Sequence, residues 1–150
     1  MKKLFLSFAV VIIAATSFAQ TPAPATTVVK GEDLIKFNET VHDFGKIKQG
    51  VPVTYDFVFK NVSSKTVVIE SATASCGCTT PVKPEQPIAK GKSDKIKAGF
   101  NAASPSPFDK TIFVKVAGVA LPMEIKIKGE VLSADAFAKY EADKGKKSGK

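Results

Sequence analysis

The chain has 150 residues, with 22 lysines, no arginine, 14 acidic residues, one histidine and two cysteines. This length suits one domain that can bury a real core, and a composition that is 44% hydrophobic and 24% charged argues against disorder. So few cysteines and histidines exclude a disulfide-rich scaffold and the Cys/His-dense zinc modules.

The first 19 residues have the parts of a secretory signal peptide. Lys2-Lys3 is a positive start, Leu4 to Ala15 is almost wholly apolar, and Ser17-Phe18-Ala19 supplies the small residues that signal peptidase reads. The apolar run is too short to span a bilayer, which takes about 20 apolar residues. We therefore expect cleavage between Ala19 and Gln20, export to the periplasm or the exterior, and no membrane anchor in the mature protein.

The positive charge of the chain lies largely at its two ends. Cleavage would remove two lysines and no acidic residue, so the formal net charge falls from +8 to +6. The segment from Lys139 to Lys150 holds five lysines and two acidic residues, so it carries +3 of this charge. The domain itself is only mildly basic, and without arginine it cannot make the bidentate contact to guanine. We therefore expect no nucleic-acid partner.

The middle of the chain predicts a β-sandwich. Residues 20–33, rich in Thr, Pro and Ala, are expected to form a flexible spacer. In residues 34–132 apolar and polar residues alternate with period two, and turn signals separate the runs. This pattern predicts an all-β sandwich of about seven to eight short antiparallel strands. The alternation predicts these inward-facing residues: Val53, Tyr55, Phe57, Phe59, Ile96, Ala98, Phe100, Ile112, Val114, Val116, Ile125 and Ile127.

Residues 133–150 differ in composition from the sandwich. Ser133 is a candidate N-cap for a short helix over Ala134 to Lys144, and Gly145 is expected to end that helix. The remaining Lys-rich tail is expected to be disordered.

The most distinctive segment is Ser75-Cys76-Gly77-Cys78-Thr79. In an oxidising compartment its two thiols could form a disulfide with each other, stay a free dithiol, bind a soft metal such as Cu(I), or bridge to another molecule. A Cys76–Cys78 bridge would close a minimal loop, which Gly77 permits because it has no Cβ. Such a bridge removes little entropy from the unfolded chain and would be reduced more easily than a structural disulfide.

His42 is the only imidazole of the chain. If the fold brought it beside Cys76 and Cys78, the three side chains could hold a metal. Its alternative role is a hydrogen-bonded structural residue, oriented by Asp43. Because these two neighbours point to opposite faces of a strand, a Cys–His–Asp catalytic arrangement is not expected. No paired carboxylates and no phosphate-binding glycine loop occur, so we expect no enzyme, no cofactor and no small-molecule substrate.

Several short motifs resemble one known family. They are Thr40-Val41-His42-Asp43-Phe44-Gly45, Gly50, Phe57 to Asn61, Ser75 to Thr79, Pro87 to Gly91, Phe108 to Ile112 and Ile127 to Val131. In this order they resemble the bacterial family called domain of unknown function 1573, and more distantly the Hydin-type immunoglobulin-like domains. One departure is Ser106-Pro107, where the family usually has a glycine in the turn.

The resemblance implies an immunoglobulin-like sandwich, export, and a bacterial source, often among the Bacteroidetes. It supplies no activity. We expect an exported, non-enzymatic binding or structural module of the bacterial envelope, whose partner is an unidentified envelope or surface protein. The contact surface would be an exposed sheet edge or an end loop, with residues 76–79 as the favoured loop. The alternatives are a thiol redox protein that uses Cys76 and Cys78, and a Cu(I)-binding periplasmic protein.

Overall fold

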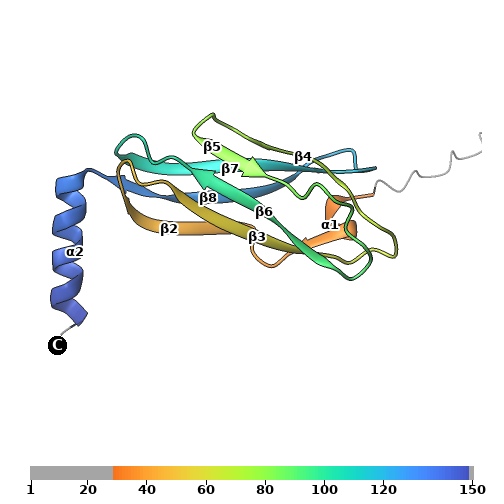
Figure 1. Ribbon diagram of the computed structural model, residues 1–150, viewed down its shortest axis with the longest axis horizontal. Coiled ribbons are helices and arrows are strands. Elements are labelled where there is room, and N and C mark those ends of the chain that lie inside the picture. The colour runs from red at the N-terminus through yellow and green to blue at the C-terminus, as the bar shows by residue number, and fades with distance from the viewer. Residues whose placement is uncertain (1–28, 149–150) are drawn as a thin grey trace, which may run out of the picture.

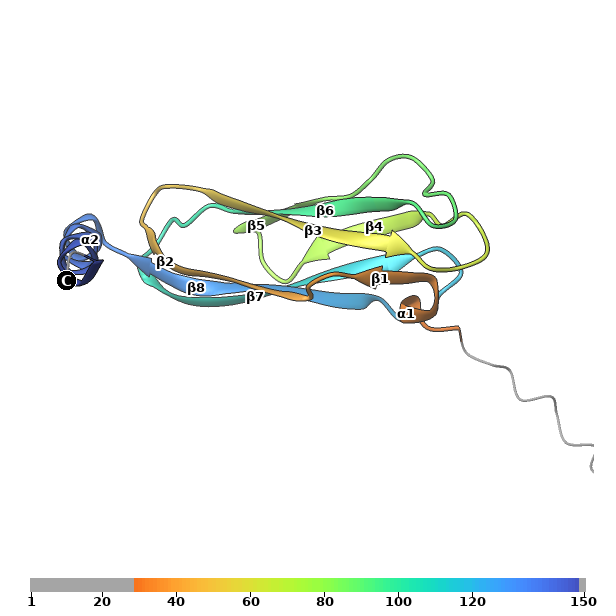
Figure 2. The ribbon, with the colours of Figure 1, turned by 90° about the horizontal axis from the view of Figure 1, so that it is seen from below.

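The computed structural model describes residues 29–148 and forms two four-stranded sheets packed face to face (Figures 1 and 2). The first sheet has the order β1-β3-β6-β5 and the second β2-β8-β7-β4. The predicted β-sandwich is therefore confirmed. The strands are β1 (Ile35–Phe37), β2 (Val41–Lys48), β3 (Val53–Asn61), β4 (Ile69–Ala74), β5 (Thr79–Val82), β6 (Ser93–Phe100), β7 (Ser106–Val116) and β8 (Met123–Leu132).

The core lies between the two sheets and follows the period-two pattern of the sequence. In β3, Phe57 and Phe59 are fully buried, while Val58 between them faces solvent. The same alternation buries Ile96, Ala98 and Phe100 in β6. Val53 and Tyr55, in the first half of the same strand β3, pack against the core but are only half-buried.

The first two strands belong to different sheets. β1 pairs antiparallel with β3, and the chain then crosses to the other sheet, where β2 runs parallel to β8. This parallel pair departs from the expected all-antiparallel arrangement. It arises because the crossing at residues 38–40 brings the chain alongside the last strand without reversing its direction.

Two helices flank the sandwich, at opposite ends in Figure 1. The short α1 (Gly31–Leu34) falls where the spacer was expected, so the folded part begins before residue 34. At the other end, α2 (Ala134–Ser148) starts as predicted, with the N–H of Ala136 donating to Ser133 Oγ at 3.4 Å.

The predicted end of α2 was wrong. Gly145 lies inside the helix, which a glycine destabilises by only about 1 kcal/mol relative to alanine. The proposed disordered tail is therefore helical as far as Ser148. None of the helices in residues 29–148 has the length and apolar character needed to cross a bilayer. The signal-peptide prediction falls on residues that lie outside this range.

Candidate functional site

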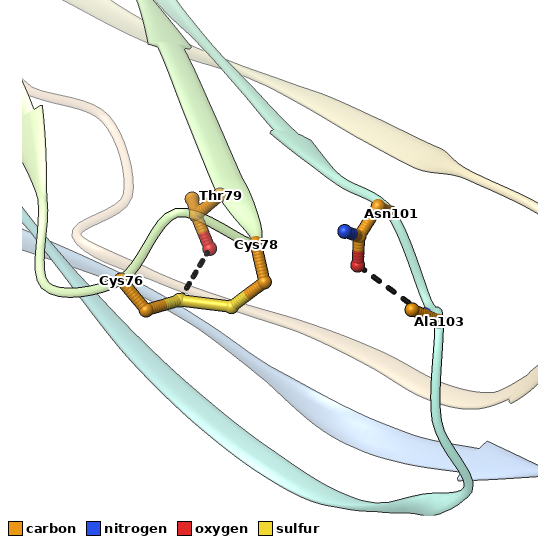
Figure 3. Close-up of a disulfide and its surroundings, with 5 residues drawn as sticks. All are labelled: Cys76, Cys78, Thr79, Asn101 and Ala103. Atoms are coloured by element: carbon orange, nitrogen blue, oxygen red, sulfur yellow. Dashed lines mark hydrogen bonds between the residues drawn. A yellow bond between two sulfur atoms is a disulfide. The ribbon is translucent and has the colours of Figure 1, made fainter.

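The Cys76–Cys78 segment forms the turn that carries the chain from β4 in one sheet to β5 in the other (Figure 3). The main chain holds the turn on both sides. The N–H of Ser75 donates to the carbonyl of Thr111 on β7 at 3.0 Å, and the N–H of Asn101 donates to the carbonyl of Cys78 at 3.2 Å. The turn is therefore fixed to both sheets by backbone hydrogen bonds.

The two cysteines are bonded to each other. Of the four states that the sequence allowed for the two thiols, the structure has the disulfide between them. Both side chains are half-buried, and Cys78 packs against the hydrophobic core. Because only Gly77 lies between the two cysteines, the disulfide only links positions that the backbone already holds close together.

Thr79 closes the turn with two hydrogen bonds to Cys76. Its N–H donates to the Cys76 carbonyl at 3.3 Å, and its Oγ1 lies 3.7 Å from Cys76 Sγ. A disulfide sulfur carries no proton, so the hydroxyl is the donor in this contact. Thr79 is 4% exposed and is one of two buried polar residues in the described part of the chain.

The loop that follows β6 lies beside this turn, and its importance could not be predicted from the sequence. Figure 3 shows Asn101 near Cys78, and the Asn101 Oδ1 accepts the N–H of Ala103 at 3.2 Å. Ala102 between them has φ = 51° and is fully buried. Such a backbone is uncommon for a residue with a Cβ and indicates local strain beside the disulfide.

His42 lies in another part of the molecule. It is on β2, and β8 and β7 separate that strand from β4, which leads into the Cys76 turn. Among residues 29–148 no three His, Cys, Asp or Glu side chains form a group that could hold a metal. The three-ligand arrangement of His42, Cys76 and Cys78 is therefore not formed, because the sheet order sets them apart.

Instead, His42 on β2 helps to connect the two sheets by packing on β3 of the other sheet. Its ring stacks on Tyr55 of β3 at a centroid distance of 3.5 Å, and its Nδ1 lies 3.5 Å from Glu39 Oε1. The Tyr55 hydroxyl donates to Glu39 Oε2 at 2.6 Å. This hydrogen bond, together with desolvation and the charge of Glu39, raises the pKa of Tyr55 above its ordinary value of 10.0.

The residues after His42 shape a bulge in β2. Asp43 Oδ1 accepts the N–H of Gly45 at 2.8 Å, and Gly45 has φ = 64° where the register with β8 shifts. Phe44 packs against the core with its ring 6.4 Å from that of Phe108. Gly129 of β8 lies against the bulge, since a Cβ there would be 2.7 Å from the Gly45 carbonyl oxygen. The motif thus has a structural role here.

Asn61 at the end of β3 is fully buried and connects two loops. Its Nδ2 donates to the carbonyls of Lys65 and Ile88 at 2.8 and 2.9 Å, and its Oδ1 accepts the N–H and the hydroxyl of Ser63. The Asn61 carbonyl accepts the N–H of Gly91, a residue with φ = 73°. Another motif glycine, Gly50, also has φ = 73° and sits in the turn after β2.

A hollow of about 780 Å³ lies where the chain crosses between the sheets. Its lining includes Ile35 and Phe37 of β1, Leu121, and Met123 and Glu124 of β8. Leu121 is 74% exposed at its rim. The hollow is a largely apolar groove, called here the β1/β8 groove.

Strand edges border this groove on both sides. On either side of β1, the Leu34 carbonyl accepts the N–H of Val62, just after β3, and the Asn38 N–H donates to the Val58 carbonyl on β3. Phe37 therefore directs its N–H and carbonyl away from β3. In β8, the N–H of Lys126 donates to the Thr40 carbonyl, and β2 pairs with β8 only from Lys126 toward the C-terminal end of β8. The main-chain N–H and carbonyl of Glu124, two residues earlier in β8, point to the same side. No strand of the described chain lies beside them there.

Comparison with known proteins supports the fold and gives no activity. A family model described as protein of unknown function (DUF1573) matches residues 35–131. No curated protein matches the sequence. A protein of unknown function from Porphyromonas gingivalis W83 superposes with a TM-score of 0.56 at 19% identity, covering 71% of this chain and 50% of that one.

Two further structures share the architecture. The ASH/PapD-like domain 7 of human CEP192 has a TM-score of 0.56 at 8% identity, covering 85% of this chain and 99% of that domain. The VesB protease of Vibrio cholerae has a TM-score of 0.52 at 16% identity, covering 67% of this chain. This chain spans only 33% of VesB and half of the P. gingivalis protein. At these identities the likeness establishes the fold alone, an immunoglobulin-like sandwich.

Proposed function

The chain belongs to the family of unknown function DUF1573, and from this premise we propose that it is an exported, non-enzymatic binding module of the bacterial envelope. The immunoglobulin-like fold supports this proposal, since such domains place their contacts in edges and end loops. The signal-peptide pattern of residues 1–19 supports export. A disulfide between neighbouring cysteines fits an oxidising compartment.

The observation that carries the proposal is the β1/β8 groove with its two free strand edges. Phe37 and Glu124 direct main-chain donors and acceptors toward it, and the lining between them is largely apolar. An extended segment of a partner protein could add beside β8, bond to these groups, and bury alternate apolar side chains between the sheets. The partner chemistry is therefore an extended β-strand with an apolar face.

The edge of β5 is a poor alternative for such addition. Because the Cys78 carbonyl accepts the N–H of Asn101, which directly follows β6, Thr79 and Pro81 direct their main-chain groups away from β6. The N–H of Thr79 already bonds to Cys76, and proline has no N–H. Val82 is nevertheless 59% exposed there. This edge therefore offers a control surface that is apolar but lacks free donors.

Site-specific photo-crosslinking in the native host tests the proposal. A photoreactive residue at Leu121 should give a discrete protein adduct, whereas one at Val82 should not. Glu124→Pro removes the N–H that faces the groove and should abolish the adduct, while Glu124→Ala should retain it. Equal adducts from both positions, or no effect of Glu124→Pro, would contradict strand addition at this groove.

Export is tested by fractionation and by the intact mass of protein purified from its host. We expect a chain that lacks residues 1–19 and two hydrogens, recovered outside the cytoplasm. Recovery in the cytoplasm with residues 1–19 retained would contradict it.

A second candidate function is thiol–disulfide exchange by Cys76 and Cys78. The favouring observation is that backbone hydrogen bonds from Ser75 and Asn101 already hold the turn, so the bond adds no new connection. Both cysteines keep part of their surface exposed, as exchange with a partner thiol requires. Equilibration with glutathione buffers measures its reduction potential. A potential as low as that of structural disulfides, below about −300 mV, would remove this candidate.

A further inference from the structure

Thr79 is buried in contact with the Cys76 sulfur. Its hydroxyl oxygen lies 3.7 Å from Cys76 Sγ. No buried side-chain N or O atom of the described residues lacks a hydrogen-bond partner. Thr79 has little access to water because the residue is only 4% exposed. The only hydrogen-bond partner that the structure gives this hydroxyl is therefore the Cys76 sulfur.

The strength of this hydrogen bond depends on the state of the sulfur. A disulfide sulfur is a weak acceptor, whereas a thiolate is a charged one, and charge-assisted hydrogen bonds are roughly twice as strong as neutral ones. The contact would persist after reduction, because the Thr79 N–H also bonds to the Cys76 carbonyl and the turn is held at Ser75 and Cys78. No comparable hydroxyl contact is formed by Cys78 among the described side-chain hydrogen bonds.

We propose that Thr79 is a positioning residue that stabilises the Cys76 thiolate, so that Cys76 is the sulfur that leaves when a thiol of the glutathione class, or a protein dithiol, reduces the pair. This inference rests on the second candidate function, thiol–disulfide exchange. It assigns the two sulfurs different roles, with Cys76 as the leaving group and Cys78 as the site of the mixed disulfide.

The exchange is a two-electron reaction in two steps. A partner thiolate attacks Cys78 Sγ, a new S–S bond forms, the Cys76–Cys78 bond breaks, and Cys76 leaves as a thiolate that accepts the Thr79 hydroxyl proton in a hydrogen bond. A second partner thiolate then attacks the partner sulfur of the mixed disulfide. The partner leaves as its own disulfide, and Cys78 takes up a proton from solvent. The cysteine pair is reduced, and two partner thiols are oxidised.

The test compares the reduced protein with three variants. Thr79→Val removes the hydroxyl at constant shape, Thr79→Ser retains it, and Thr80→Val makes the same change at the neighbouring exposed threonine. Iodoacetamide labelling across a pH series, read by peptide mass, follows each thiol separately. Circular dichroism establishes that each variant is folded.

We expect Cys76 to be labelled at lower pH than Cys78 in the parent protein. Thr79→Val should reduce Cys76 labelling near neutral pH about tenfold, the loss of one charge-assisted hydrogen bond, and should leave Cys78 unchanged. At a pH where Cys76 is mostly a thiolate, the same tenfold loss of thiolate stability lowers the reduction potential by about 30 mV for a two-electron couple. Thr79→Ser and Thr80→Val should behave like the parent.

Equal labelling of the two thiols, or a Thr79→Val profile identical to that of the parent, would overturn the inference. The measurements distinguish failure of redox cycling by the cysteine pair from failure of the role of Thr79. A very low potential in the parent with an intact Thr79 effect removes redox cycling and retains the assignment of Cys76. Ready exchange with glutathione that Thr79→Val does not alter removes the role of Thr79 and retains redox cycling.

Discussion

Reduction of the Cys76–Cys78 bond should cost the domain little stability. In the chain-entropy model the stabilisation by a disulfide grows with the loop that it closes, and this loop contains three residues. The relation gives roughly 1.6 kcal/mol at 25 °C, against about 3 kcal/mol for a 15-residue loop. The backbone bonds at Ser75 and Asn101 remain after reduction, so we expect the loss to be no larger than this value.

Urea unfolding followed by circular dichroism, with and without a phosphine reductant, measures the effect. We expect the midpoint to fall while the slope m stays constant, because the same surface is exposed on unfolding. The double variant Cys76→Ala/Cys78→Ala is the control and should not respond to the reductant. A loss of about 2–5 kcal/mol in the parent, as for a native structural disulfide, would refute the reasoning.

Three other predictions concern residues outside the disulfide. Asn61→Ala should lower the free energy of unfolding by about 2–4 kcal/mol, because it removes the four hydrogen bonds of a fully buried side chain. The exposed Asn101→Ala should cost about 1 kcal/mol or less in the same urea assay, and equal losses would contradict this. Glu39→Gln should lower the pKa of Tyr55 toward 10.0 in an ultraviolet titration. Since the folded-state pKa is raised, the parent should lose stability as the pH rises above about 10, and the variant should lose less. Gly129→Ala should cost about 1–3 kcal/mol, because its Cβ would lie 2.7 Å from the Gly45 carbonyl oxygen in the β2 bulge and 2.9 Å from Phe108 Cζ. A neutral result would show that both the bulge and the Phe108 ring can move aside.

The sequence predicts the fold well because its information is local. Period-two alternation states which face of each strand is buried, and Phe57, Phe59, Ile96 and Ile112 are fully buried as that pattern requires. The N-cap at Ser133 was also readable, since a cap depends on a few neighbouring residues. The end of α2 was not, because one glycine is a weak signal among lysines that favour a helix.

The candidate site depends on contacts between residues that are distant in sequence. The sequence singled out Cys76 and Cys78 as an unusual pair but left their state open. It could not tell that Asn101 would anchor the turn or that the hydroxyl of Thr79 would lie on Cys76 rather than in solvent. It also could not separate His42 from the cysteines, because that separation follows from the sheet order.

The sequence by itself therefore determined which face of most strands points inward, where most of the turns fall, and that two cysteines share one turn. The tertiary structure decided which sheet each strand joins, and with it the crossing after Phe37, the β1/β8 groove, and the stacking of His42 on Tyr55. The physical reason is that alternation records burial along a single strand. Strand pairing and the contacts of a buried hydroxyl depend on how all eight strands pack together.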